Sequence, residues 1–159
     1  MLPRYARGVP SAKSLTAFPG FLLSKIGQAI TERLTEELAP LKLRARHFGL
    51  LATAAAQGME PASQERLSRA LGLVPSAIVG IVDDLERLGA VRRVVDPENR
   101  RRNSIELTKQ GQTLLARCFE AARQVEDEIL GELSATQRTS LTKLLQRVGG
   151  SLGIAPRGQ

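Results

Sequence analysis

The chain has 159 residues, of which 42% are hydrophobic and 25% charged, and these proportions are those of a globular rather than a disordered protein. Its formal net charge of +7 and its sequence pI near 10.5 favour an anionic partner such as nucleic acid or a membrane surface. The single cysteine excludes an internal disulfide, and no apolar run approaches the roughly 18 residues of a membrane-spanning helix. The N-terminus lacks the continuous apolar core of a signal peptide, so we expect a cytoplasmic protein with no membrane partner.

The first third of the chain predicts an arm followed by two helices. Residues 1–17 mix proline, glycine and serine with positive charge, and they are either an unstructured start or a basic arm that reaches phosphates or a second subunit. Over residues 21–38 the apolar residues recur every four positions and form one stripe of a helix: Leu22, Ile26, Ile30, Leu34 and Leu38. Pro40 stops this helix, and a second helix, rich in alanine and leucine, is predicted over residues 43–56.

Residues 63–88 predict two short helices separated by a glycine turn. Ser63 can cap the first helix, and Gly72 breaks it. In the second helix Pro75 stands where no N–H is needed, and the apolar residues follow the helical period: Ile78, Ile81, Val82, Leu85 and Leu88. Gly89 ends this helix. Two helices joined in this way form a helix-turn-helix unit, whose second helix can enter the major groove of DNA.

The next segment predicts a β-hairpin with a basic tip. Residues 91–95 and 104–107 are short β-prone runs, and the turn-rich sequence D-P-E-N-R-R-R-N lies between them. A hairpin that follows a helix-turn-helix is a wing. The order of these elements therefore predicts a winged helix.

Two further helices are predicted after the wing. Thr108 can cap a long helix that runs to about Leu130, with an apolar inner side made by Leu114, Leu115, Cys118, Ala121, Ala122, Val125 and Ile129. Ser134 and Gln137 form a capping box at the start of the last helix, which we expect to end at Gly149 and Gly150. Residues 151–159 are expected to be a frayed tail.

Three motifs, in this order and spacing, resemble the MarR family, the multiple-antibiotic-resistance regulators of bacteria: L-G-L-V-P-S-A-I-V-G-I-V-D-D-L-E-R-L-G-A-V-R-R, D-P-E-N-R-R-R and L-T-K-Q-G. The resemblance covers roughly residues 20–150. It implies a mainly α fold with a small β wing, in which a winged helix-turn-helix lobe (41–107) is flanked by N- and C-terminal dimerisation helices (18–40 and 108–150) within one domain (18–150). The implied partners are double-stranded DNA, a second copy of the chain and a small aromatic or anionic effector. The residues assigned to the dimer interface are Leu22, Ile26, Leu141, Leu144, Leu145 and Val148.

The wing carries three consecutive arginines, Arg100, Arg101 and Arg102. Arginine is always charged, planar and weakly hydrated, so such a tip suits a narrow minor groove or a phosphate fork. The resemblance places Arg100 and Arg101 at the paired arginines of the family, with Arg100 as the residue that enters the groove. The family usually has an aspartate just before this pair, whereas this chain has Asn99, which removes one charge partner. A solvated run of charge is the alternative interpretation.

The second helix of the helix-turn-helix offers few groups that read bases. The residues expected to face DNA are Pro75, Ser76, Ala77, Val79 and Gly80. Only Ser76 supplies a side-chain hydrogen bond, while Ala77 or Val79 can touch a thymine methyl. Phosphate anchors are expected at Gln64, at Ser76 and, by resemblance, at Arg93 rather than Arg92. We therefore predict that phosphate contacts and groove shape carry much of the affinity, with a steep salt dependence.

Two residues leave alternatives open. The resemblance puts the effector cavity near Arg46, His47 and Phe48, where a neutral imidazole can bind a carboxylate or phenol or respond to pH; a satisfied core or dimer-interface histidine is the alternative. Cys118 is either a small buried hydrophobe or a redox sensor, and the family's peroxide sensors place their cysteine near the N-terminal helices instead.

No cluster of metal ligands, glycine-rich phosphate loop or nucleophile with a base is apparent, so we predict no catalytic residues, no metal and no cofactor. The sequence predicts a homodimeric transcription regulator, a ligand-responsive repressor that binds a pseudo-palindromic operator. A winged helix used for low-specificity DNA coating or for protein contact is the alternative.

Overall fold

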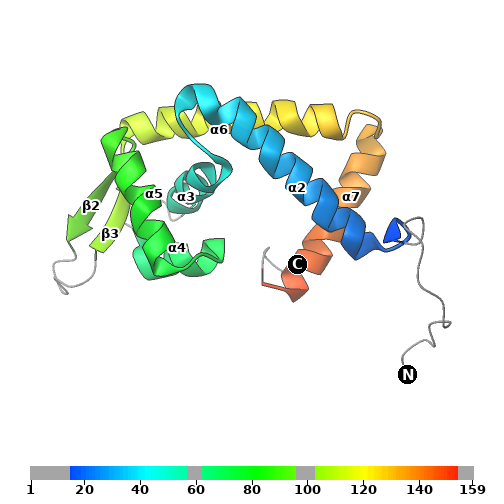
Figure 1. Cartoon of the computed structure of the whole chain (residues 1–159), viewed down its shortest axis with the longest axis horizontal. Helices are drawn as coiled ribbons and strands as arrows, with labels where there is room; N and C mark the ends of the chain where they lie inside the picture. The colour runs from blue at the N-terminus through cyan, green and yellow to red at the C-terminus, as the bar shows by residue number, and fades with distance from the viewer. Residues whose placement is uncertain (1–14, 57–61, 96–102, 154–159) are drawn as a thin grey trace.

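The computed structural model describes residues 15–56, 62–95 and 103–153 of the chain (Figure 1). Within these ranges the elements, in chain order, are helix α2 (Pro19–Leu38), the 3-10 turn η1 (Ala39–Leu41), α3 (Ala45–Ala55), strand β1 (Ala62–Ser63), α4 (Gln64–Leu71), α5 (Pro75–Arg87), β2 (Val91–Val95), β3 (Asn103–Leu107), α6 (Lys109–Ile129) and α7 (Ala135–Ser151). Figure 1 shows a lobe of α3, α4, α5 and the strands at one end, with α7 toward the other end. The mainly α fold with a small β wing is confirmed.

The connection between α2 and α3 differs slightly from expectation. Pro40 lies inside the 3-10 turn that follows α2, and the turn ends at Lys42, whose φ of 59° is left-handed. Leu43 was predicted to begin the next helix, but it is buried before the helix starts at Ala45, and its N–H donates to the Leu38 carbonyl. The tight turn thus inserts Leu43 into the core and delays the helix by two residues.

The helix-turn-helix forms as its capping residues predict. The Ser63 hydroxyl accepts a hydrogen bond from the Arg66 N–H at the start of α4. Gly72 ends α4 with a φ of 62°, a conformation that glycine adopts without steric cost. The Leu73 N–H then donates to the Ser68 carbonyl, and the Ser68 hydroxyl donates to the Leu73 carbonyl at 2.5 Å. These reciprocal bonds fix the angle between α4 and α5.

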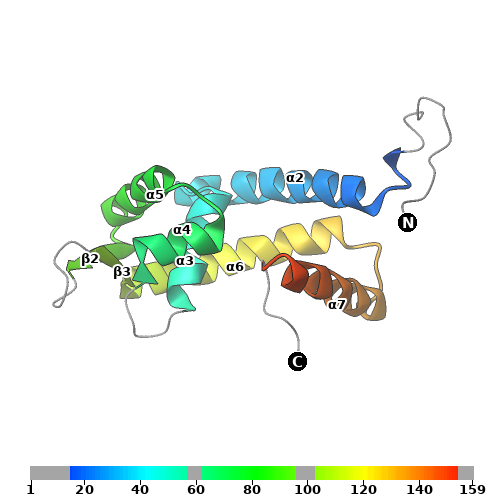
Figure 2. The same ribbon diagram turned by 90° about the horizontal axis from the view of Figure 1, so that it is seen from below.

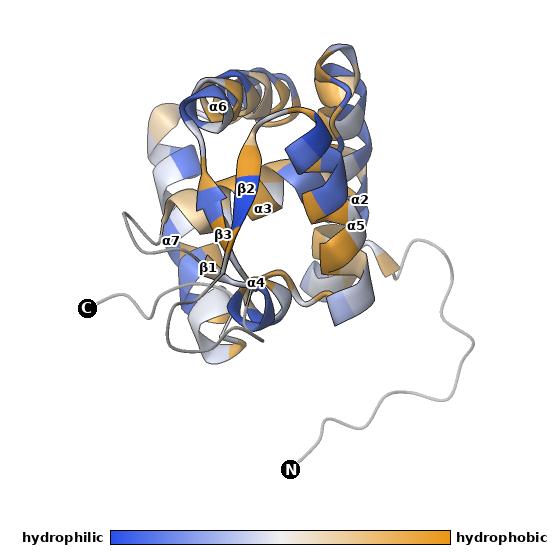
Figure 3. Ribbon diagram, turned by 90° about the vertical axis from the view of Figure 1, so that its left-hand side faces the viewer, coloured by the Kyte–Doolittle hydropathy of each residue, from blue (hydrophilic) through white to orange (hydrophobic). Residues whose placement is uncertain are grey.

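The sheet has three antiparallel strands in the order β1-β3-β2, where the sequence predicted only a two-stranded hairpin. Val91 pairs with Leu107 and Val95 with Asn103, so β3 begins one residue earlier than expected. The additional strand β1 places Ala62 opposite Ile105. A two-residue strand has no alternating pattern that sequence can reveal. Figure 3 views the lobe from the wing side and shows β2 and β3 between α6, α4 and α5, with α3 behind them.

A close contact attaches α6 to the lobe. The Thr108 hydroxyl accepts from the Gly111 N–H and donates to the Gly89 carbonyl at 2.6 Å, with the Ala90 carbonyl as a longer second acceptor at 3.1 Å, so it caps α6 and ties it to the end of α5. A Cβ atom at Gly111 would lie 2.0 Å from the Ala90 carbonyl oxygen, so only glycine permits this approach. From there α6 runs alongside α2 toward α7 (Figure 2).

The last helix is one residue longer than expected. The capping box of Ser134 and Gln137 forms at its start, as predicted. Gly149 and Gly150 do not end the helix, because it continues through Ser151 and the backbone turns left-handed only at Gly153. Glycine lowers helix stability but does not by itself stop a helix.

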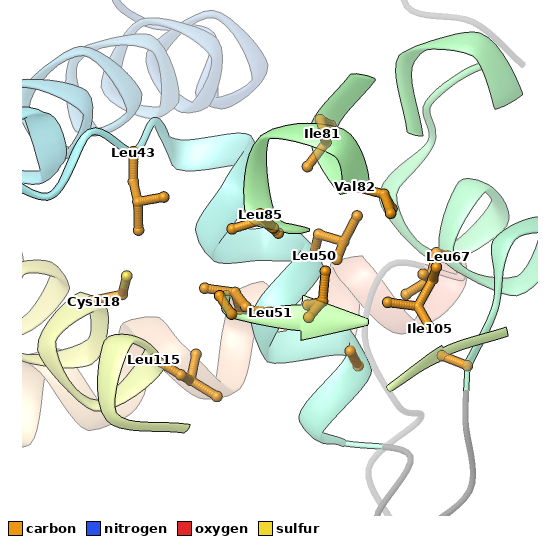
Figure 4. Packing of buried hydrophobic residues seen from close by; sticks show 14 of the residues in the cluster. Leu43, Leu50, Leu51, Leu67, Ile81, Val82, Leu85, Ile105, Leu115 and Cys118 are labelled. Atoms are coloured by element: carbon orange, nitrogen blue, oxygen red, sulfur yellow. The ribbon is translucent and has the colours of Figure 1, made fainter. Parts of the chain in front are cut away.

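The hydrophobic core lies inside the lobe, where α3, α4, α5, the sheet and the first half of α6 meet (Figure 4). Its fully buried side chains include Leu50, Leu51, Leu67, Ile78, Val82, Leu85 and Ile105. Each such side chain contributes roughly 1.5–3 kcal/mol when it leaves water. The core therefore fixes the position of α5 relative to the sheet without any contribution from α7.

Candidate nucleic-acid interface

Helix α5 presents a clear outer face. Ile78, Ile81, Val82 and Leu85 are buried in the core, while Pro75, Ser76, Val79 and Gly80 are exposed. Ala77 was expected on the exposed face, but it is half-buried, because its position on the helix turns it toward the side where α3 packs. The exposed residues of the first two turns form one surface free to meet a partner.

This outer face carries little polar chemistry in its first two turns. Ser76 alone among its exposed side chains can form a hydrogen bond. Val79 is 41% exposed, and Val74, which precedes the helix, is 64% exposed. The apolar character predicted for this helix is confirmed.

The acidic residues further along α5 are all paired within the chain. Arg93 on β2 bridges two of them: its guanidinium donates to Asp83 at 2.5 Å and to Glu86, and its backbone N–H donates to Glu86 at 2.9 Å. The Asp83 hydrogen bond is the main reason that the pKa of Arg93 is raised. The Arg93 side chain is 28% exposed. Arg93 therefore fastens the wing to α5, and a phosphate would have to compete with these two carboxylates for it.

The neighbouring arginine on β2 has a different environment. Arg92 pairs with Glu106 on β3, with 2.9 Å between the Nε donor and the carboxylate oxygen, and its side chain is 67% exposed. The more exposed of the pair is Arg92, whereas the sequence interpretation favoured Arg93 for DNA.

His47 is buried, with 3% of its surface exposed, and both ring nitrogens are occupied. Its Nδ1 accepts the Arg44 N–H at 2.9 Å, and its Nε2 lies 3.1 Å from the Asp84 Oδ2. The hydrogen bond with His47 is the main reason that the pKa of Asp84 is lowered, and Arg87 adds to the effect. These are the contacts of a satisfied core histidine, which was the alternative to a ligand-binding role.

Arg46 and Phe48, the neighbours of His47 in the sequence, lie in different surroundings. Arg46 lines an open hollow of about 280 Å³ on α5, beside Ser76, Ala77 and Gly80. Phe48 instead packs edge-on against Phe119 of α6, with 5.1 Å between ring centroids. A ligand cavity that used Arg46, His47 and Phe48 together would require these side chains to rearrange.

Of the remaining residues predicted to contact DNA, Gln64 lies within the described residues and the wing arginines do not. Gln64 is the first residue of α4 and is half-buried. Arg100, Arg101 and Arg102 lie outside the described residues. Arg66 is exposed at the start of α4, near Gln64.

Cys118 is fully buried on the inner side of α6, and burial raises the pKa of its thiol to about 11. A thiol in this state is a poor nucleophile. Across residues 15–56, 62–95 and 103–153, no three side chains of His, Cys, Asp or Glu group as metal ligands. None of the helices in the same ranges is long and apolar enough to cross a membrane.

Sequence reasoning missed two features of this surface. The first is the pairing of Asp83 and Glu86 with Arg93. The sequence contains a signal for it, because the two acids are three residues apart on one face of a helix and a basic strand follows after a glycine turn. The second is the position of Arg46 beside Ser76, for which the sequence contains no signal, because it depends on how α3 packs against α5.

The chain is similar to known proteins over most of its length. The model of the MarR family matches residues 45–102. The HTH-type transcriptional regulator PecS of Dickeya dadantii is 34% identical over 127 residues, which cover 79% of this chain and 76% of PecS.

Two solved structures have the same fold. One is CouR of Rhodococcus jostii RHA1 bound to p-coumaroyl-CoA, which is 30% identical with a TM-score of 0.72 and covers 86% of this chain and 95% of that one. The other is the HTH-type transcriptional repressor Rv2887 of Mycobacterium tuberculosis in complex with DNA, which is 26% identical with a TM-score of 0.70 and covers 83% of this chain and 98% of that one. The helix-turn-helix, the attached wing and this similarity together establish that the chain belongs to the MarR family and is a DNA-binding transcription regulator.

Proposed function

We propose that the protein is a homodimeric, ligand-responsive repressor that binds a pseudo-palindromic operator. The observation that carries the proposal is the division of the chain into two ends. One end presents the outer face of α5 and the wing, and the other presents apolar faces on α2 and α7. A regulator that must hold two DNA-binding lobes at a fixed spacing needs both ends.

The apolar faces at the second end support the dimer. Leu22 and Ile26 on α2 are 40% and 43% exposed, and Leu144, Leu145 and Val148 on α7 are 61%, 41% and 51% exposed, while Leu141 is half-buried. Large apolar patches of this kind are unusual on monomers. We assign them to the interface between two copies, formed by the segments 18–40 and 108–150, with the lobe 41–107 free to bind DNA.

In the dimer, each α5 enters one major groove, with Ser76, Val79 and Gly80 nearest to the bases. The two half-sites then lie about 34 Å apart, one turn of DNA. Gln64 and the N-terminus of α4 contact phosphate, and the arginines of the wing tip, Arg100 first among them, enter the adjacent minor groove. Because the contacts are mostly to phosphate, the affinity falls steeply with salt.

The effector is a small aromatic or anionic molecule that binds between the dimerisation helices and the lobe. CouR, a relative of similar fold, is bound to p-coumaroyl-CoA, which is both aromatic and anionic. Arg46 and Phe48 supply a charge and a ring to this site after they rearrange from their separate surroundings, Arg46 beside α5 and Phe48 against Phe119, and His47 supports them from the core. Release requires that the effector bind more tightly to a lobe spacing that does not fit the operator. The protein acts on its DNA in the cytoplasm and uses no catalytic residue, metal or cofactor.

The experiment is a selection of genomic fragments with purified protein, followed by footprinting and sedimentation. We expect a two-fold symmetric footprint, a dimer at micromolar concentration, and a strong preference over random competitor DNA. Arg100→Ala should weaken operator binding more than Ser76→Ala. A monomer in sedimentation would remove the symmetric operator from the proposal.

The sparse polar chemistry of α5 favours one second candidate, a winged helix that coats DNA with low specificity. Ser76 is the one exposed side chain in the first two turns of α5 that can form a hydrogen bond with a base. Discrimination between bases therefore rests on few contacts. Equal binding to the selected fragment and to random competitor would decide for this candidate.

A further inference from the structure

The large apolar side chains that stay exposed fall into two groups in the described part of the chain. One group belongs to the dimerisation helices and the residues that flank them, from Leu15 to Ile26 and from Phe119 to Leu152. The second group consists of Val74 and Val79, at the N-terminal end of α5. The proposed dimer covers the first group and leaves the two valines unexplained.

Few side chains around Val79 are available to form hydrogen bonds with DNA bases. Pro75 has no donor, and a Cβ atom at Gly80 would meet nothing within 4 Å. Asp83 and Arg87, one turn further, are held by Arg93 and Asp84 respectively. Val79 therefore lies on an open surface, next to a residue without a side chain and beside committed charges.

The major groove contains one apolar group that matches such a surface, the C5-methyl of thymine. Valine is restricted at χ1, so it loses little side-chain entropy when it packs against a methyl group. The missing side chain at Gly80 lets a base edge approach the backbone of α5 next to Val79. We propose that Val79 is a specificity-determining residue that recognises the C5-methyl group of a thymine in each half-site. This inference rests on the proposed function, because it requires α5 to enter the major groove.

The first test replaces single thymines of the selected operator by uracil, which lacks only the methyl group. At one thymine in each half-site, the wild-type affinity should fall by about fourfold, the factor expected for one buried methyl-sized group. Val79→Ala changes both subunits of the dimer, so it should bind the unmodified operator about sixteenfold more weakly, the product of two fourfold effects, and show no further loss with uracil. Val74→Ala is the matched control, because it makes the same chemical change at the more exposed valine, and it should keep the sensitivity to uracil.

The second test restores the methyl group on a different base. At the same position, a 5-methylcytosine·guanine pair should bind wild-type protein more tightly than a cytosine·guanine pair, and Val79→Ala should not distinguish the two. Circular dichroism of both variants controls for folding, which should be intact because both side chains are exposed.

The outcomes separate this inference from the proposed function. A preference for the selected operator without any effect of uracil would overturn the role of Val79 and leave the repressor proposal standing. Sensitivity that persists in Val79→Ala, or is lost in Val74→Ala, would also overturn it. Equal binding to all fragments would overturn both.

Discussion

The Nε2 atom of His47 lies 3.1 Å from the Asp84 Oδ2, and this contact joins the first turn of α3 to α5. Because Nδ1 accepts the Arg44 N–H, the proton of the neutral ring is on Nε2, from which it donates to Asp84. His47 also occupies the third helical position, where a capping box normally has Glu or Gln. One side chain thus caps α3 and holds the DNA-facing helix.

Asp84→Asn should reduce the loss of stability in acid. The pKa of Asp84 is lowered in the folded state, chiefly by the hydrogen bond with His47, so its contribution to stability is present above the unfolded pKa of about 3.9 and is lost as pH falls through the lower folded value. Urea denaturation at a series of pH values should show a shallower decrease below about pH 4 in the variant. Glu132→Gln, an exposed change after α6, is the control and should keep the wild-type decrease. Identical curves for Asp84→Asn and wild type would contradict the assignment.

Gly111→Ala should destabilise the protein by about 1–3 kcal/mol or more, because the new methyl overlaps the Ala90 carbonyl oxygen and forces α6 away from the lobe. Gly80→Ala is the matched change in a helix with open space, and it should raise the unfolding free energy by up to about 1 kcal/mol. Thermal and urea unfolding measure both. Similar stability of the two variants would mean that α6 does not approach Ala90 as closely as described.

Cys118 should be unreactive in the native protein at pH 8. With its pKa raised to about 11 and its side chain buried, the thiol stays protonated, and a chromogenic disulfide reagent should react only after unfolding in urea. Because the unfolded thiol ionises near about 8.5, this group costs stability as pH rises from there toward the folded pKa. DNA affinity should survive peroxide treatment, and Cys118→Ala should behave in the same way. Release of DNA by peroxide in wild type alone would establish a redox sensor.

Leu144→Glu should dissociate the dimer. This side chain is 61% exposed on α7 and would place an unpaired charge inside an apolar interface. Gln146→Glu makes the same change of charge on the opposite side of the helix and should leave the dimer intact. Sedimentation at several concentrations distinguishes the two, and a fully dimeric Leu144→Glu variant would place the interface elsewhere.

Arg93→Ala should weaken DNA binding by releasing the wing and by leaving Asp83 and Glu86 unpaired near phosphates. If Arg93 acts through these acids, removing their charges in Asp83→Asn/Glu86→Gln should make the further change Arg93→Ala much less harmful. A direct phosphate contact would instead lower the slope of log affinity against log salt by about 0.9 for each subunit, or about 1.8 for the dimer, whatever the state of the acids. Titrations at several salt concentrations, with Arg92→Ala in parallel, separate the two roles.

The local signals in the sequence predicted the fold well. Ser63, Thr108 and Ser134 cap the helices that they were expected to cap, because a cap depends on residues within one turn. The strand β1 and the early burial of Leu43 escaped prediction, since both depend on contacts with distant segments. Gly149 and Gly150 were wrongly predicted to end α7, because glycine lowers the stability of a helix by only a small amount.

The sequence predicted which part of the chain forms the candidate site, but it did not predict which side chains contact one another there. The outer face of α5 follows from the helical period, and Val79 and Ser76 lie where that period puts them. The partners of His47 and Arg93 depend on how α3 and β2 pack on α5. Charge and residue type show that such groups need partners, whereas only the tertiary fold determines which partners they find.

Helix α6 extends from the wing to the dimerisation end as one element of 21 residues. At 1.5 Å per residue it is a lever of about 30 Å, so a tilt of about 10° at the α7 end moves the wing end by about 5 Å. Gly111 and Thr108 clamp that moving end to the helix-turn-helix. A small angular change between two subunits is therefore converted into a displacement comparable to the spacing of one and a half base pairs, enough to take a recognition helix out of register with its groove.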